Sequence, residues 1–537
     1  MVAEVPQRSS SSLSQPRAVG TGGMDRWPLL EPLLLAEKLN QPTSSTPLQW
    51  VSDDTLFQLQ RCQRRAFLDR HGDPDHQNEP SEYLLKIRED SALHRRTVLQ
   101  AYAGHERPRY PRSDWLAGAR ATQALMAQGV SCIHNGVLTA TVVHGGHPPY
   151  LSKPDLLVKQ PGPSWLGDWH YVPIDIRLGK KPKPEYQLVV AFHALLLSAF
   201  QGQVIDHGWL VLKEKRYRVD LDKQMPLLLD GLADCGETFA RTTAPEVFIS
   251  RSRCDMCVWL PHCYEAAQAQ QHLSLLPGVT LSRYRRLKPL GLTSVAALAA
   301  LTPAALSQIA GFERDVAQKL VVQAQSTMGG CAIARPHPPK SFALTPTDLP
   351  SAPYELYFDI EAAPDKNLVY LHGVLAIETA TGQETFIPLI AERPEDEARA
   401  WQQFQYVMAE YPGSPVYHFC PYEAQTVRRL AQEYGAIIDI EALLTRFVDI
   451  HQRITASVVL PVESYALKPI ARWMGFDWRD EEANGAQSIC WYDNWISECD
   501  RTYLDLILRY NEDDCRATYQ VKKWLSEFAQ PYWAQLD

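Results

Sequence analysis

Between residues 51 and 270 the spacing of apolar and polar positions changes repeatedly, which predicts alternating helices and strands. Helical spacing predicts a helix with Cys62 that Ser52 caps, and another with His94 over about 81–103. Further apolar helices are predicted at 185–200 and 223–241. Runs of period two rich in Val, Ile and Tyr predict strands at 136–143, 150–158, 170–176 and 208–219. The order predicts a mixed α/β core.

The pattern is different on both sides of this core. Residues 1–23 are rich in Ser, Gln and Gly, a composition that predicts disorder. A short helix followed by a linker is predicted within residues 24–50. Residues 272–325 hold short apolar stretches broken by glycine turns, which predicts several short helices. A linker rich in Pro and Thr precedes a second α/β domain. The predicted divisions are 1–50, 51–270, 271–331, 332–352 and 353–537.

The composition is that of a globular protein with several domains. A chain of 537 residues exceeds the size of one hydrophobic core, and 45% hydrophobic and 21% charged residues are ordinary values. The chain has no run of about eighteen apolar residues, so no transmembrane helix is predicted. The N-terminus lacks the features of a signal peptide, so we expect an intracellular, cytoplasmic protein with no membrane partner. We therefore expect its 11 cysteines to be reduced thiols and metal ligands rather than disulfides.

Charge divides unevenly along the chain. Residues 51–330 hold 32 Lys and Arg against 27 Asp and Glu, a net charge of +5. Residues 331–537 hold 17 against 31, a net charge of −14, and together these give the total of −9 because residues 1–50 balance. Such asymmetry is typical of solvated surfaces, and it also predicts different tasks for the two parts. We expect the basic part to capture nucleic acid.

Three cysteines lie close together late in the first α/β region. Cys254, Cys257 and Cys263 have the spacing C-x2-C-x5-C, and Cys62 lies far upstream. Four thiolates are a ligand set for zinc and for an iron–sulfur cluster, and their number does not distinguish the two. One early cysteine and a late triplet that bracket an α/β core resemble the layout of RecB-like nucleases. That resemblance implies a [4Fe–4S] cluster, with zinc as the alternative.

The same resemblance implies a PD-(D/E)xK restriction-endonuclease-like core with Mg²⁺ or Mn²⁺ bound. The residues that match its metal-binding positions are His94, Asp155 and Asp175. The residues that match its catalytic positions are Asp155, Asp175, Arg177 and Gln187. Two positions depart from the family pattern, since Arg177 replaces a lysine and Ala191 replaces a tyrosine. Arginine keeps the charge but not the compact shape of an ammonium group.

Residues 271–331 resemble tandem helix-hairpin-helix units. The resemblance rests on Leu276-Pro-Gly-Val and Ile309-Ala-Gly-Phe, which place glycine turns between short helices. Such turns would present backbone N–H groups to DNA phosphates, and Arg283, Arg285, Arg286 and Lys288 would add contacts. A small packing bundle is the alternative.

The C-terminal domain carries a set of carboxylates. Asp359 and Glu361 lie two positions apart in a predicted strand, so both face one side of it. Tyr510 and Asp514 lie one helical turn apart near the end of the chain. With Glu423 between them, these positions resemble the DEDDy group of RNase H-like 3′–5′ exonucleases.

That resemblance assigns roles to the carboxylates and to two further residues. It implies that the carboxylates hold two metal ions and that Tyr510 orients the attacking water. Glu423 stands where the family usually has Asp, and Asp449 is a possible substitute. Lys468 resembles a family lysine that contacts phosphate or these carboxylates.

Together these patterns resemble large RecB-like nucleases with a C-terminal RNase H-like domain. We expect a metal-dependent nuclease that acts on DNA single strands or ends. The chain lacks a G-x-x-x-x-G-K-[ST] phosphate loop, so a helicase would act as a separate partner. The alternatives are a non-catalytic adaptor that recruits a helicase or repair enzyme, and an RNA-processing exonuclease.

Overall fold

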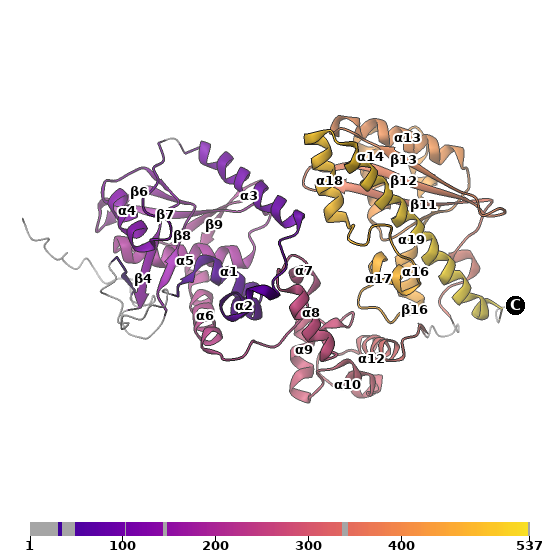
Figure 1. Cartoon of the computed structure of the whole chain (residues 1–537), viewed down its shortest axis with the longest axis horizontal. Coiled ribbons are helices and arrows are strands. Elements are labelled where there is room, and N and C mark those ends of the chain that lie inside the picture. The colour runs from indigo at the N-terminus through magenta and orange to yellow at the C-terminus, as the bar shows by residue number, and fades with distance from the viewer. Residues whose placement is uncertain (1–29, 35–48, 103, 143–147, 336–341, 535–537) are drawn as a thin grey trace, which may run out of the picture. The chain divides into compact units, whose positions relative to one another are not determined.

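A computed structural model describes residues 30–34, 49–102, 104–142, 148–335 and 342–534 (Figure 1). The chain divides into two compact units. The first comprises Met1–Gln77 and Ile87–Glu246, and the second comprises Asn78–Lys86 and Val247–Asp537. The predicted disorder at 1–23 lies outside the described residues, as does most of 24–50.

Two sheets form the first unit, and both surround helix α5 (Figure 1). The larger sheet has the order β3-β6-β7-β8-β9, and its strands are Cys132–His134, Leu156–Ser164, Gly167–Ile176, His207–Val211 and Arg216–Asp220. The smaller sheet has the order β1-β4-β5-β2, and its strands are Leu30–Pro32, Leu138–Val142, Tyr150–Ser152 and Val51–Ser52. The helices are α1 Asp53–Arg61, α2 Gln63–His71, α3 Glu82–Gln100, α4 Trp115–Ala127, α5 Pro184–Gln201 and α6 Leu221–Ala240. The mixed α/β core is as predicted.

Three predicted elements of this unit were wrong in detail. The predicted strand 150–158 is two strands in different sheets, because Pro154 interrupts the run between β5 and β6. The predicted strand 208–219 is the hairpin β8–β9, which turns at the polar residues 213–215. Within residues 24–50, predicted as a short helix followed by a linker, Leu30–Pro32 is strand β1 and pairs with β4, because Pro32 disfavours helical backbone before it.

Short helices follow residue 247 in the second unit, and those beyond residue 272 are as predicted. They are α7 Arg251–Cys254, α8 Leu260–Ala269, α9 Leu281–Leu287, α10 Val295–Ala299, α11 Pro303–Ser307 and α12 Arg314–Gly329. Gly278, Gly291 and Gly311 have positive φ angles, which is why glycine occupies these turns. The assignment of these turns to helix-hairpin-helix units stays a prediction.

The segment predicted as a linker, 332–352, is in part a packed element. Ile333–Ala334 forms β10 and pairs with β16, Val458–Val459. Phe342, Leu344 and Leu349 are buried in the core of the C-terminal domain. The Pro and Thr content concealed these apolar anchors, so the prediction of a linker was wrong for them.

A five-stranded sheet with helices on both faces forms the rest of the second unit (Figure 1). Its order is β13-β12-β11-β14-β15, and the strands are Glu384–Ile390, Leu368–Glu378, Tyr354–Ala363, Val416–His418 and Phe447–Asp449. Strands β11, β14 and β15 are parallel, while β12 and β13 are antiparallel to their neighbours. The helices are α13 Glu397–Glu410, α14 Tyr422–Tyr434, α15 Ile440–Leu444, α16 Ile450–Ser457, α17 Leu467–Trp473, α18 Gly485–Glu498 and α19 Arg501–Trp533.

Side chains of strand β11 point alternately to the two faces of the sheet, and this decides which of them contact α19. Leu356, Phe358 and Ile360 pack into the core beneath α13 and α14. Tyr357 packs on the opposite face with residues of α19, and the pleat turns the next odd-numbered positions the same way. Among the described residues, no helix has both the length and the apolar character needed to cross a bilayer.

Candidate metal centre

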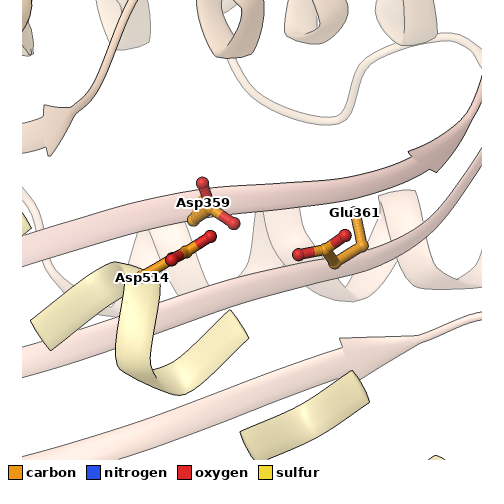
Figure 2. A group of neighbouring side chains, drawn as sticks. All are labelled: Asp359, Glu361 and Asp514. Carbon is orange, nitrogen blue, oxygen red and sulfur yellow. The ribbon is translucent and has the colours of Figure 1, made fainter. Parts of the chain in front are cut away.

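Strand β11 and helix α19 bring three carboxylates together (Figure 2). Asp359 and Glu361 lie on β11, and Asp514 faces them from α19. One ligand oxygen of each lies within 4.8 Å of the others. Across the described residues, no other group of three or more Asp, Glu, His or Cys side chains meets this limit. We call Asp359, Glu361 and Asp514 the acidic trio.

Neutral donors hold two members of the trio. Asn511 Nδ2 donates to Asp359 Oδ2 at 2.7 Å, and Trp478 Nε1 donates to Asp514 Oδ1 at 2.7 Å. No ion pair to the trio occurs in the described part of the chain; the neighbouring Arg479 pairs with Asp513 and Glu512 instead. The negative charge of the trio is therefore oriented but not neutralised by these partners.

Gly373 makes room for Asn511. It lies opposite Asp359 in the register of β11 and β12, and a Cβ atom there would overlap Asn511 Oδ1. Asn511 is fully buried, so it has little room to withdraw. The sequence prediction missed Asn511, Gly373 and Trp478. The spacing of three residues between Asn511 and Asp514, on one helix face, was the available signal for Asn511.

Burial and mutual repulsion oppose ionisation of the trio. Burial, reinforced by the charge of Asp514, raises the pKa of Glu361 to about 8. Burial also raises the pKa of Asp514 to about 7. Burial and the charges of Asp514 and Glu361 raise the pKa of Asp359 well above its usual range. A buried carboxylate needs a compensating charge, and a hard divalent cation with oxygen ligands supplies it. The trio therefore fits Mg²⁺ or Mn²⁺.

Tyr510 lies one turn before Asp514 on α19 and hydrogen-bonds to it. Burial, followed by the charge of Asp514, raises the pKa of Tyr510 well above its usual value. On the other side of the trio, Tyr370 and Ser488 hydrogen-bond each other at 2.8 Å, and both bond to Glu361. The phenol of Tyr510 thus stays protonated beside the trio and can orient a neighbouring oxygen atom.

Glu423 lies in the first turn of α14 and outside the distance limit that defines the trio. Its Oε2 lies 3.3 Å from His418 Nδ1, and burial raises its pKa. The charge of Glu423 still raises the pKa of Asp359. Asp449, the alternative, caps α16 by accepting the N–H of Gln452 at 3.0 Å. Glu423 stays the predicted fourth carboxylate, and Asp449, which caps α16, stays the alternative.

Lys468 approaches Asp514 across an aromatic ring. Its ammonium group donates to the carbonyl oxygens of Glu481, at 3.1 Å, and Ala483. It also lies 5.3 Å from the centre of the Trp478 ring, and its charge lowers the pKa of Asp514. The charge of Lys468 thus acts on Asp514, while its hydrogen bonds go to backbone carbonyls. Its contact with phosphate or with the carboxylates stays a prediction.

A cavity of about 270 Å³ lies beside the end of β11. Its walls include Ala362, Leu368, Tyr422, Thr426 and Arg429. The wall that Ala362 contributes is adjacent in the chain to Glu361. The walls of the cavity thus combine an aromatic ring, apolar surface and hydrogen-bonding groups.

In the first unit, cations pair with the predicted carboxylates. Arg177 Nε lies 2.5 Å from Asp175 Oδ2, and Arg95 Nε lies 3.0 Å from Asp155 Oδ1. His193 Nε2 lies 3.8 Å from Asp175 Oδ1. Arg177 and His193 lower the pKa of Asp175 against the effect of burial. Burial and the charge of Asp175 raise the pKa of Asp155 to about 7. This pair is largely neutralised by the protein itself.

His94 and Gln187 are the remaining predicted residues of the first unit. His94 lies on α3, and burial lowers its pKa. Gln187 lies in the first turn of α5, where its Nε2 donates to Pro182 O at 2.9 Å and its Oε1 accepts from Gln224 at 3.2 Å. Within the described residues, His94 does not form a group with Asp155 and Asp175 that meets the limit met by the trio.

The cysteines lie as follows. Cys254 ends α7, Cys257 lies in the turn that follows, and Cys263 lies on α8. Cys62 lies between α1 and α2 in the other compact unit. All 11 cysteines are among the described residues, and none forms a disulfide. The absence of disulfides agrees with the expectation of thiols. The four-cysteine cluster stays a prediction.

Comparison with known families supports the C-terminal part of the sequence prediction. A family model described as the RNase_H superfamily matches residues 356–526. A search of the curated proteins found no match. The chain thus contains an RNase H-like α/β domain, and the acidic trio lies within it. Such a domain is consistent with a nuclease-type function and a divalent metal ion.

Proposed function

We propose that this protein is a metal-dependent nuclease that hydrolyses phosphodiester bonds of DNA, on single strands or at ends. The observation that carries the proposal is the acidic trio within an RNase H-like domain. Glu361 is buried and Asp359 and Asp514 are half-buried, and such a group with neutral partners is unfavourable unless a cation joins it. Phosphodiester hydrolysis uses that arrangement.

In this proposal, Asp359, Glu361 and Asp514 hold Mg²⁺ or Mn²⁺, and Glu423 assists them. The bound metal supplies Lewis acidity toward the phosphate and lowers the pKa of a water molecule. Tyr510, whose phenol is protonated and bonded to Asp514, orients the attacking water. In this proposal the cavity lined by Tyr422 and Arg429 would hold the terminal nucleotide of a strand. Cleavage in the 3′–5′ direction is the polarity that the DEDDy pattern favours.

The remaining regions would capture the substrate. We propose a RecB-like domain at 51–270 that binds the strand and is held by a [4Fe–4S] cluster on Cys62, Cys254, Cys257 and Cys263. The turns within 271–331 would contact phosphates, consistent with the positive balance of 51–330. A helicase acting in DNA repair would be a separate partner.

The test is cleavage of end-labelled single-stranded DNA, duplex DNA and RNA with Mg²⁺ or Mn²⁺. Wild-type protein is compared with Asp359→Ala and Asp175→Ala, and with Asp505→Ala as a control. Asp505 is an exposed carboxylate on the same helix as Asp514, and it pairs with Arg501. We expect Asp359→Ala to abolish the product ladder and Asp505→Ala to leave it unchanged.

Three outcomes would change the proposal. A product that only Asp175→Ala removes would place a second nuclease in the first unit. Cleavage of RNA alone would make the protein an RNA-processing enzyme. If wild-type protein cleaves no substrate with either metal, the nuclease proposal fails and the nucleic-acid adaptor takes its place.

A further inference from the structure

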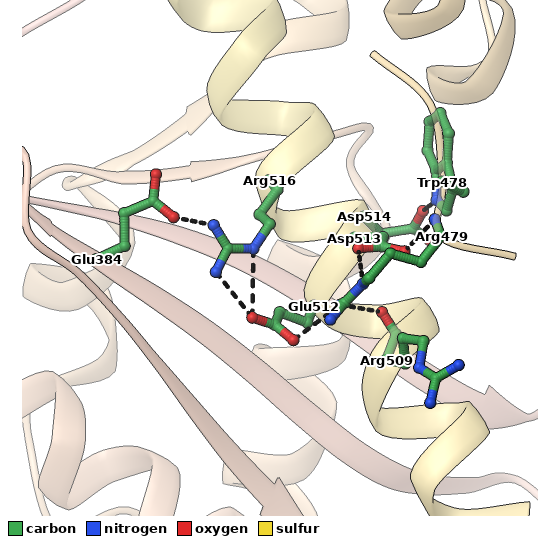
Figure 3. A network of polar contacts seen from close by, with 8 residues as sticks. All are labelled: Glu384, Trp478, Arg479, Arg509, Glu512, Asp513, Asp514 and Arg516. Carbon is green, nitrogen blue, oxygen red and sulfur yellow. Dashed lines mark hydrogen bonds and ion pairs between the residues drawn. The ribbon is translucent and has the colours of Figure 1, made fainter.

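The loop between α17 and α18 contacts the turn of α19 that carries Asp514 (Figure 3). Two adjacent loop residues bond to two adjacent helix residues: Trp478 bonds to Asp514, and Arg479 bonds to Asp513. Figure 3 shows both contacts on the same stretch of helix. The loop therefore contacts α19 at the turn that contributes Asp514 to the acidic trio.

Arg479 clamps the loop by several hydrogen bonds. Its backbone N–H donates to Asp513 Oδ2 at 3.0 Å, and its Nε donates to Asp513 Oδ1 at 2.8 Å. Its Nη2 donates to Arg509 O at 3.0 Å and to Glu512 Oε2 at 2.8 Å. Asp513 is buried, so its two charge-assisted bonds to Arg479 are partly shielded from solvent, whereas the bonds of Nη2 are exposed. The backbone next to Trp478 is thereby held in place.

The clamp extends to the edge of the sheet (Figure 3). Glu512 also accepts from Arg516 at 2.8 Å, and Arg516 pairs with Glu384 on β13. These contacts connect the loop, helix α19 and strand β13.

Packing gives the Trp478 ring a single location. The ring is buried, and the Phe476 ring meets it edge to face at 5.0 Å between centroids. The ammonium group of Lys468 lies over it at 5.3 Å, an arrangement that favours a cation over the indole face. Its N–H group can therefore point only at Asp514.

A neutral donor suits this position. An arginine or lysine would orient Asp514 but would also neutralise it and compete with a metal ion, as Arg177 does beside Asp175. The indole N–H takes one acceptor position on Oδ1 of Asp514, and Tyr510 bonds to the same carboxylate. A carboxylate has about four lone-pair positions, so these two bonds leave others for a metal ion. Partners of this kind orient metal ligands and tune the affinity of the site.

We propose that Trp478 is the positioning residue for Asp514, and that Arg479 holds Trp478 in place through Asp513. This inference rests on the proposed function, because it assigns Asp514 to a metal ion. It goes further in naming a residue outside the carboxylate set that determines how tightly the metal is bound.

The experiment measures Mn²⁺ binding to the full-length protein by calorimetry, without substrate. Sites that Asp514→Asn abolishes define binding at the trio. Trp478→Phe removes only the indole N–H, and we expect it to weaken this binding by about 10- to 100-fold. Trp401→Phe is the matched control, because Trp401 is also buried and donates to Gly435 O at 2.8 Å. We expect Trp401→Phe to bind Mn²⁺ as the wild type does.

The kinetics of nucleic-acid cleavage provide a second measurement. We expect Trp478→Phe to lower kcat at a fixed, subsaturating Mn²⁺ concentration and to leave KM for the nucleic acid unchanged. Excess Mn²⁺ should restore kcat. A general loss of structure would not be rescued by metal in this way.

Two results would overturn the inference. One is wild-type Mn²⁺ affinity in Trp478→Phe, and the other is an equal loss in Trp401→Phe. If Trp478→Phe does not fold, Arg479→Met tests the clamp from its exposed side and must weaken Mn²⁺ binding in the same direction. Failure of the proposed function has a different signature, since wild-type protein would then bind Mn²⁺ at the trio without cleaving any nucleic acid.

Discussion

The two sets of candidate carboxylates differ in what balances their charge. In the first unit, Arg95 and Arg177 pair with Asp155 and Asp175. In the C-terminal domain, neutral donors bond to the acidic trio, and no ion pair to it occurs among the described residues. Each set has one buried carboxylate, Asp175 or Glu361, beside half-buried ones, so burial alone does not distinguish them.

The two sites differ in the source of the positive charge that can compensate their carboxylates. A carboxylate that already has a guanidinium partner gains little from a cation, since the cation must displace that partner. The trio lacks such a partner, and its pKa values are raised because burial and the mutual repulsion of its members oppose ionisation. Divalent metal binding is therefore expected at the trio rather than at the pair Asp155 and Asp175.

The largest expected effect is loss of metal binding at the trio. Mutation of a residue that only hydrogen-bonds to a metal ligand weakens metal binding by up to about 100-fold. Asp359→Asn removes a ligand itself, so it should weaken Mn²⁺ binding by more than about 100-fold. Asp175→Asn should leave Mn²⁺ affinity unchanged, because Arg177 already balances that carboxylate. Calorimetry on the full-length protein measures both. Equal losses in the two variants would erase the distinction between the sites.

The next effect is on stability in the first unit. Arg177→Met leaves Asp175 buried without its main partner, which costs about 3–5 kcal/mol in the free energy of unfolding. Arg218→Met is the control, since its pair with Asp206 is exposed and contributes at most about 1 kcal/mol. Urea unfolding of both variants measures the costs. Similar values for the two arginines would show that the buried pair is not essential.

The two sites should also respond oppositely to pH in the metal-free protein. The pKa of Glu361 rises from 4.5 to about 8 on folding, so the folded state binds this proton more tightly than the unfolded chain. Its contribution to stability is therefore present below about pH 4.5 and is lost as the pH rises through about 8. The pKa of Asp175 is lowered, so its contribution is present above pH 3.8 and is lost as the pH falls.

Thermal unfolding from about pH 5 to about pH 8 measures the Glu361 contribution. Glu361→Gln should reduce the loss of stability on raising the pH by on the order of 2 kcal/mol. Saturating Mn²⁺ should reduce the same loss in the wild type, because the cation favours the ionised carboxylates. A pH dependence identical in wild type and Glu361→Gln would contradict the raised pKa.

The smallest effect is expected from displacing a partner of the trio. Gly373→Ala places a methyl group against Asn511 Oδ1 and should move the amide away from Asp359. We expect Mn²⁺ affinity to fall about 10-fold. Gly485→Ala is the control, because its Cβ would meet no atom within 4 Å. An unchanged affinity in Gly373→Ala would show that Asn511 does not orient Asp359.

Much of the trio followed from local sequence rules. The spacing of Asp359 and Glu361 decides that both lie on one face of a strand, and strand β11 has this form. The helical spacing of Tyr510 and Asp514 decides that both face one way on α19. These are short-range properties of the backbone, which is why the sequence was sufficient to predict them.

Charge compensation required tertiary structure. Trp478 and Gly373 lie far from Asp514 and Asp359 in sequence, and no periodicity connects them. Arg177 was recognised as a replacement for lysine, but only its distance from Asp175 shows that it neutralises the carboxylate.

Within this chain, the sequence by itself determined the α/β pattern, the glycine turns and the positions of the acidic residues on their strand and helix. Only the tertiary structure decided which carboxylates have a cationic partner and which have neutral donors. The reason is physical: backbone geometry repeats over a few residues, whereas the electrostatic environment of a buried group depends on every chain segment that folding brings to it.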